Sequence, residues 1–227
     1  MNQQNNKSDG DQPMSVVIEF SSQPKISRRT AIHEAGHAVA AWFTGRSNIE
    51  IAAADGARKA KTSMGLVADC VAVTQWQGVT PRTLDDIQNL SLRERTDPDQ
   101  VRDIKTQATI DIIIAMSGIV AESIYSGVEI GELMNTSGKS DMESISDLKK
   151  VLLAVGATQE EAEDIQDKSL TRCYSFVQMK WWEVIALAKI IENKSHIPPS
   201  YFIAIMGMID HPFPTVISLQ DMDNIAS

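Results

Sequence analysis

The chain has 227 residues, of which 43% are apolar and 22% are charged, so it can bury a globular core. Acidic residues outnumber basic residues by 30 to 21, and the formal net charge is −9. Because such a surface repels phosphate backbones and no dense run of Lys or Arg offsets it, we expect no nucleic-acid partner.

The cysteines and the apolar runs indicate the cellular compartment of the protein. Cys70 and Cys173 are far apart and form no CxxC pair, which is typical of reduced thiols in a cytosolic protein. The polar start of the chain contains no apolar segment like that of a secretory signal. The longest apolar run, residues 112–121, is half the length of roughly twenty residues that a membrane-spanning helix needs. We therefore expect a soluble, cytoplasmic chain with no membrane span.

The first third of the chain predicts a tail, one helix and short strands. Residues 1–13 are polar and predict a disordered tail. Apolar side chains at helical spacing predict a helix over 27–44. Strands are predicted, in chain order, at 16–20, 49–54 and 64–74, with a polar loop over 55–63 before the last one.

The rest of the chain predicts helices. Thr80 and Pro81 favour a helix start, and 93–100 favours an exposed, charged connection. Thr158 and Glu161 form a capping-box pattern. Further helices are predicted at 100–125, from Asp141 onward after a polar loop at 134–140, at 158–193 and at 201–208. The fold class is therefore mainly α with a small β-sheet (α+β), in one domain over 14–210 with a C-terminal tail over 211–227.

One motif carries chemistry: His33, Glu34 and His37 form an HExxH pattern on the first predicted helix. Positions i and i+4 lie on one helix face, so the two imidazoles can share one tetrahedral zinc ion. Zinc lowers the pKa of a bound water to about 7, and a carboxylate beside it can then act as general base. The pattern indicates a zinc-dependent hydrolase with Glu34 as the base.

A zinc site of this kind needs a third protein ligand and keeps one position open. The motif alone leaves that ligand unassigned. The candidates are His196, His211 and the carboxylates downstream of the motif, and periodicity does not choose among them.

The chain resembles the peptidase domain of the FtsH-type zinc metalloproteases, which normally follows an ATP-driven unfoldase domain. The likeness begins with 28–39 (RRTAIHEAGHAV), continues with a strand pair ending in Met64-Gly65-Leu66-Val67, and extends over roughly 27–210. Residues 117–122 (SGIVAE) are similar to the family's GGRxAE segment, and 136–141 (TSGKSD) to its TGASND loop.

This resemblance implies roles for further residues. It implies an Asp as third zinc ligand at the start of the helix after the TSG loop; Asp141 matches best, and Asp147 is the rival. It implies that Glu122 accepts the free N–H of a ligating histidine. It also implies that substrate binds along the edge strand formed by Met64, Gly65, Leu66 and Val67.

The chain also departs from the family. It has no GxxxxGK[ST] phosphate loop, so we expect no ATP binding of the family's kind. Ile119 stands where the family has Arg, and 75–100 looks like an insertion.

The sequence thus predicts a soluble endopeptidase, with one zinc ion, that cleaves unfolded or flexible polypeptide. A separate ATPase or unfoldase is a possible partner, and the oligomeric state is left open. The alternatives are a non-proteolytic relative that works by binding a partner, and a peptidase that cleaves one specific partner.

Overall fold

The computed structural model describes residues 26–55, 58–78, 84–90, 97–210, 217 and 219–226. Several predictions lie outside the described residues: the tail at 1–13, the strand at 16–20, the helix start at Thr80 and Pro81, the first half of the connection at 93–100, and His211.

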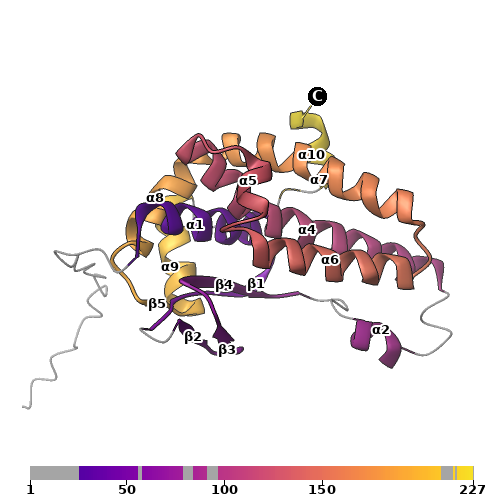
Figure 1. Cartoon of the computed structure of the whole chain (residues 1–227), viewed down its shortest axis with the longest axis horizontal. Coiled ribbons are helices and arrows are strands. Elements are labelled where there is room, and N and C mark those ends of the chain that lie inside the picture. Colours follow the sequence, from indigo (N-terminus) through magenta and orange to yellow (C-terminus); the bar gives the residue numbers. More distant parts are fainter. Residues whose placement is uncertain are drawn as a thin grey trace, which may run out of the picture.

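The protein is mainly helical with two small antiparallel sheets, which confirms the α+β class (Figure 1). The long helices are α1 (Arg28–Phe43), α4 (Pro98–Ser126), α6 (Lys139–Ala154), α7 (Gln159–Met179), α8 (Trp181–Ile191) and α9 (Pro199–Ile209). The short helices are α2 (Leu84–Asn89), α5 (Ile130–Met134) and α10 (Leu219–Ala226). One sheet has the order β4 (Ala72–Gln77), β1 (Ser47–Ala53), β5 (His196–Ile197), and the other is a hairpin of β2 (Lys59–Thr62) and β3 (Gly65–Ala68).

Helices α1 and α4 pack backbone against backbone at the centre of the molecule. A Cβ added to Gly36 would lie 2.4 Å from the carbonyl oxygen of Ser117 and 3.0 Å from Cα of Gly118, so only glycine permits this approach. Helix α4 begins where the Asp97 side chain accepts two backbone N–H bonds, and it ends at Gly127 in the left-handed region.

By length and composition, α4 could cross a membrane. The apolar run at 112–121, on which the expectation of no membrane span rested, is only part of this helix. However, 78% of its most apolar window is buried inside the protein, against α1, α6 and α7 among others, as is usual for a core helix.

The small sheet lies between α1 on one face and the β2–β3 hairpin on the other (Figure 1). Ile49 and Ile51 of β1 belong to the core shared with α1. Side chains alternate between the faces of a strand, so Glu50 points away from α1. This alternation decides which residues of β1 and β4 reach the candidate site.

Two predictions for the region of the hairpin are wrong, one for a strand and one for a loop. The strand predicted over 64–74 is two strands, β3 and β4, because the chain turns at Asp69, whose φ is +57°. The loop predicted over 55–63 contains β2, whose polar sequence (KAKT) gave no apolar alternation to detect. Pairing with β3 supplies the hydrogen bonds that make it a strand.

The single helix predicted over 158–193 is also wrong, although its capping box at Thr158 and Glu161 is confirmed. The helix breaks at Lys180, which ends α7 and begins α8 without a glycine or proline. The break lets α8 pack on α1, and the Lys180 ammonium lies 3.7 Å from the ring centroid of Phe43 on α1. Within the predicted C-terminal tail, residues 219–226 form α10, whose Met222 is buried in the core.

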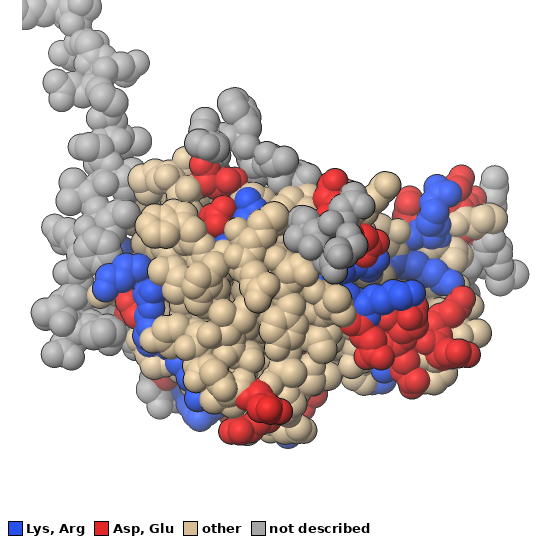
Figure 2. All heavy atoms as spheres, turned by 90° about the horizontal axis from the view of Figure 1, so that it is seen from above, with Lys and Arg blue, Asp and Glu red and all other residues tan. Residues whose placement is uncertain are grey.

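Charged side chains are unevenly distributed. Figure 2 shows acidic side chains gathered towards one end of the face it presents, the end at which α7 begins, and a largely uncharged middle. The first turns of α7 supply exposed acids there, among them Glu160, Glu163 and Asp164.

Candidate metal centre

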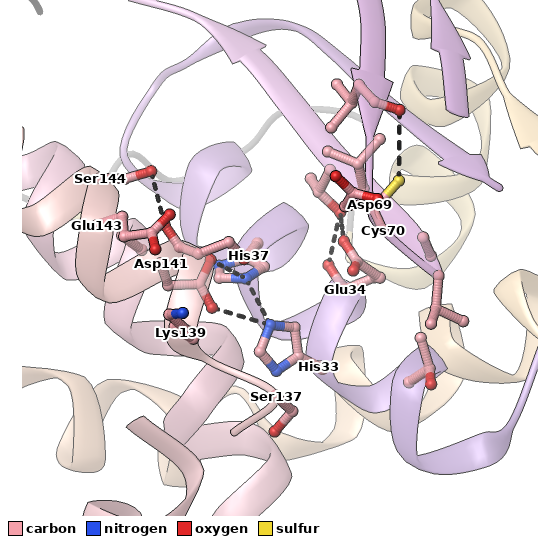
Figure 3. A pocket seen from close by; sticks show the side chains of 18 of the residues that line it. His33, Glu34, His37, Asp69, Cys70, Ser137, Lys139, Asp141, Glu143 and Ser144 are labelled. Atoms are coloured by element: carbon pink, nitrogen blue, oxygen red, sulfur yellow. Dashed lines mark hydrogen bonds and ion pairs between the residues drawn. The ribbon is translucent and has the colours of Figure 1, made fainter. Parts of the chain in front are cut away.

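His33, His37 and Asp141 come together at one point beneath an open groove (Figure 3). The Nε2 atoms of the two histidines are 3.0 Å apart, and the Asp141 carboxylate lies 3.1 Å from His33 Nε2 and 3.4 Å from His37 Nε2. A zinc ion about 2.0–2.1 Å from each tetrahedral ligand would hold them roughly 3.4 Å apart. The three residues therefore have the spacing of a ligand set.

Two helices meet to make this group. His33 and His37 are one turn apart on α1, and both are buried. Asp141 lies in the first turn of α6, which approaches α4 closely: a Cβ on Gly138 would lie 2.6 Å from the Ile119 side chain. Ile119, the residue that departs from the family pattern, is thus an apolar packing partner of the Gly138 turn.

The hydrogen bonds on the far side of each ring fix which nitrogen faces the group. His37 Nδ1 lies 2.8 Å from the carbonyl oxygen of Ile114, which can only accept, so Nδ1 carries the proton. His33 Nδ1 likewise lies 2.8 Å from the Glu122 carboxylate. In the neutral rings both Nε2 atoms therefore present lone pairs to each other and to Asp141.

A convergence of lone pairs requires a cation between them. Asp141 Oδ2 is buried, and His33 Nε2 lies 3.1 Å from it. Two imidazole nitrogens and a carboxylate oxygen are ligand types that bind a divalent transition metal. These residues fit a metal ion, and the described part of the chain holds no other such group.

The pKa shifts of His33 and Asp141 also indicate that the group attracts positive charge. Burial alone would lower the pKa of His33, but hydrogen bonds to Asp141 and Glu122 outweigh it and raise the pKa to about 10. Burial would raise the pKa of Asp141, but the charge of His37 and the hydrogen bond to His33 hold it far below its usual range. Without an ion, a proton supplies the positive charge that the group attracts.

Glu122 lies behind His33, with its carboxylate 2.8 Å from His33 Nδ1. Its carboxylate accepts from His33, from the Ser137 hydroxyl at 2.8 Å and from the Arg29 guanidinium. Burial would raise its pKa, but the donors, His33 first, lower it to about 2. Arg29 and Ser137 were not predicted, and no sequence pattern links them to Glu122.

Glu34 lies beside the group with its carboxylate turned towards the groove (Figure 3). It is 5% exposed, and the Thr74 hydroxyl donates to it at 2.7 Å. Thr74 is on β4, forty residues away in the chain. Thr74 was not predicted, because a threonine in a predicted strand gives no signal of such a contact.

The ring of His37 is held between two elements. A Cβ on Gly118 of α4 would lie 2.3 Å from His37 Nε2, so the helix backbone lies against the ring. The indole of Trp76 is stacked near it, with centroids 6.4 Å apart, and its Nε1–H donates to the buried Asp111 carboxylate at 3.0 Å. Trp76 and Asp111 were also not predicted.

The groove over the metal group has a volume of about 1350 Å³. Most small-molecule pockets are smaller, roughly 300–1,000 Å³. One side is formed by residues 71–76 with the end of the hairpin, and the other by 136–144 on and before α6. Strand β4 pairs only with β1 among the described strands, so its other edge is available to a further strand.

The other predicted site residues lie elsewhere. Asp147 is exposed and pairs with Lys150 at 2.7 Å. His196, a candidate for the third ligand, lies on β5 away from the group and contacts Glu50 at 2.5 Å, because β1 and β5 pair there. In the predicted substrate strand, Met64 precedes β3; Met64 and Val67 line the groove, whereas Gly65 and Leu66 do not.

No protein-family model matches this chain, and no curated protein matches it. Function is therefore inferred from the geometry of the buried His33–His37–Asp141 group, which can hold a metal ion, and from the groove above it.

Proposed function

We propose that this protein is a zinc-dependent endopeptidase that cleaves unfolded or flexible polypeptide. One observation carries the proposal: two imidazole lone pairs and a carboxylate converge on one point, with a buried glutamate beside them, under a groove too large for most small ligands. A scaffold protein has no need of a desolvated carboxylate next to such a group, because burying a charge is costly.

His33, His37 and Asp141 would hold the ion. Zinc bound there would polarise a substrate carbonyl and acidify water. Two histidines and one carboxylate also hold ferrous iron in some oxygenases, so the donor set alone does not select hydrolysis. Glu34 favours hydrolysis, because amide hydrolysis needs a group that moves a proton and a facial triad for oxygen chemistry does not.

Glu34 would act as the proton carrier. Its carboxylate takes a proton from water as the water oxygen attacks the carbonyl carbon, and it gives that proton to the amine nitrogen as the C–N bond breaks. The Thr74 hydroxyl, which donates to Glu34 at 2.7 Å, would orient the carboxylate.

The groove suggests how a polypeptide would bind. The free edge of β4 runs past the site: Thr74 contacts Glu34, and Trp76 stacks on His37. An extended segment could add to this edge through main-chain hydrogen bonds, which tolerate many sequences. Only unfolded or flexible chains can present such a segment, so folded substrates would require a separate ATPase or unfoldase.

The resemblance of the sequence to FtsH-type peptidase domains supports this proposal. The segments that carry it contribute, in order, the helix with both histidines, Glu122 behind His33, and Asp141 at the start of α6.

The alternative is a non-proteolytic relative that keeps the metal and works by binding a partner. The replacement of the family's Arg by Ile119, which packs on Gly138, is the observation that favours it. A peptidase restricted to one partner protein would share the whole site with the primary proposal.

The test combines metal analysis with one substitution. The purified protein should contain about one zinc ion per chain, and chelator-sensitive cleavage of casein should fall by at least about 100-fold in Glu34→Gln. Glu34→Gln should retain its zinc, and Glu160→Gln, an exposed control on α7, should behave as wild type. Zinc-loaded wild-type protein that cleaves no unfolded substrate would favour the partner-binding alternative, and iron in place of zinc would contradict the proposal.

A further inference from the structure

The β2–β3 hairpin is attached to the main sheet by two side chains. Glu50 on β1 and Gln75 on β4 are directly opposite in the antiparallel ladder, so they point to the same face. Thr74 and Trp76 point to the other face, where they contact Glu34 and His37. Gln75 therefore reaches the hairpin from the strand whose opposite face forms the wall of the metal site.

Glu50 holds the turn of the hairpin in place through its hydrogen bonds. Its side chain is 1% exposed, yet the proposed chemistry does not use it. The carboxylate accepts the backbone N–H of Ser63 at 2.9 Å, the Ser63 hydroxyl, and a bond from His196 Nε2 at 2.5 Å. Gln75 accepts from the hydroxyl of Thr62 in the same turn.

The charge on Glu50 is kept by these donors. Burial would raise its pKa, but the bonds from Ser63 and His196 lower it below the usual value. Hydrogen bonds to an ionised acceptor are about twice as strong as neutral ones, so this one carboxylate ties β1, β5 and the hairpin turn together.

The anchored turn leads directly into the groove. Met64 follows Ser63, and its N–H donates to the Thr62 hydroxyl at 3.2 Å. Met64 is 42% exposed and lines the groove together with Val67 of β3 and Val71, which is 51% exposed. The hairpin presents Met64 and Val67, and Val71 lies just before β4, so the three form an apolar wall of the groove that contains the metal group.

We propose that Glu50 is a positioning residue: it holds the hairpin so that Met64, Val67 and Val71 form a subsite for an apolar side chain of the polypeptide substrate. This inference rests on the proposed peptidase function. It assigns a role to His196 as well, as the second donor that fixes the Glu50 carboxylate.

Substrate preference tests the subsite. In a flexible fluorogenic peptide series that varies one position at a time, one position should prefer Leu over Ser in kcat/KM by about 10-fold for the wild type. Glu50→Gln should reduce that preference to about 2-fold through KM, with kcat and zinc content unchanged, since it removes the charge that strengthens the bonds from Ser63 and His196. Met64→Ser should reduce it as well, and Glu160→Gln should not.

Hydrogen exchange tests the anchor without any cleavage assay. Glu50→Gln should speed amide exchange by about 10-fold across 59–68 and leave α1 unchanged, and Ser63→Ala should give a smaller effect in the same segment. Unchanged exchange in Glu50→Gln would overturn the anchor, and faster exchange with an unchanged Leu preference would overturn the subsite. A wild type that holds no zinc and cleaves nothing would refute the peptidase proposal instead, and the exchange result would still decide the role of Glu50 as an anchor.

Discussion

The two walls of the groove are built in different ways. On the helical wall, α1 is buried from Ala31 to Ala41, its glycine contacts α4 backbone to backbone, and His33 and His37 are fixed on their far sides by Glu122 and Ile114. The hairpin wall is mostly exposed along β3 and is attached through Glu50 and Gln75. Residues that would hold an ion tolerate little displacement. A wall that would contact varied substrate side chains needs only to stay beside the groove. Substitutions on the helical wall should therefore have larger effects.

The largest effect is expected from removing the third ligand. Asp141→Ala should weaken zinc binding by more than the roughly 100-fold upper limit seen for outer hydrogen-bond partners. The measurement is competition with a chromophoric chelator. Asp147→Ala is the matched control, because its carboxylate is exposed and pairs only with Lys150. Equal zinc loss in both variants would contradict the ligand assignment.

The protonation of the helical wall should make metal binding depend on pH. The folded pKa of His33, about 10, exceeds its ordinary value of 6.5, so a proton must leave before an ion binds. Zinc affinity should therefore rise by about 10-fold per pH unit per displaced proton between pH 6 and 8. In the metal-free protein the same shift stabilises the fold below pH 6.5, and that contribution disappears as the pH rises towards 10. Zinc affinity that is flat over this range would contradict the protonated resting state.

A smaller effect is expected where the helices touch. Gly118→Ala would place a methyl group 2.3 Å from His37 Nε2, so it should lower the free energy of unfolding by about 1–3 kcal/mol and weaken zinc binding. Thermal unfolding and chelator competition measure the two effects. Gly131→Ala on α5, where a Cβ meets no atom within 4 Å, should be neutral or slightly stabilising. A stable, zinc-binding Gly118→Ala variant would show that the helical wall is less rigid than its contacts indicate.

The smallest effect is expected on the outer face of the hairpin. Leu66 is 64% exposed and does not line the groove, so Leu66→Ser should change the free energy of unfolding by no more than about 0.5 kcal/mol. Cleavage and zinc content should be unchanged. A destabilisation above 2 kcal/mol in a denaturant titration would mean that Leu66 packs against something in solution, and the contrast between the walls would fail.

Local patterns in the sequence determined the helix that carries the chemistry. An α-helix has about 3.6 residues per turn, so the spacing of His33 and His37 places both on one face. The capping box at Thr158 depends only on the next three residues. Both were predictable because they depend on neighbours along the chain.

Tertiary structure decided the rest. Periodicity did not separate Asp141 from Asp147; the family resemblance favoured Asp141, and the approach of α6 to α4 through Gly138 is what brings it to the histidines. The break at Lys180 carries no glycine or proline signal and follows from the packing of α8 on α1. Thr74 meets Glu34 through strand pairing and sheet packing, across forty residues of chain. Such contacts depend on how whole elements pack, and periodicity within one element contains no information about its distant partner.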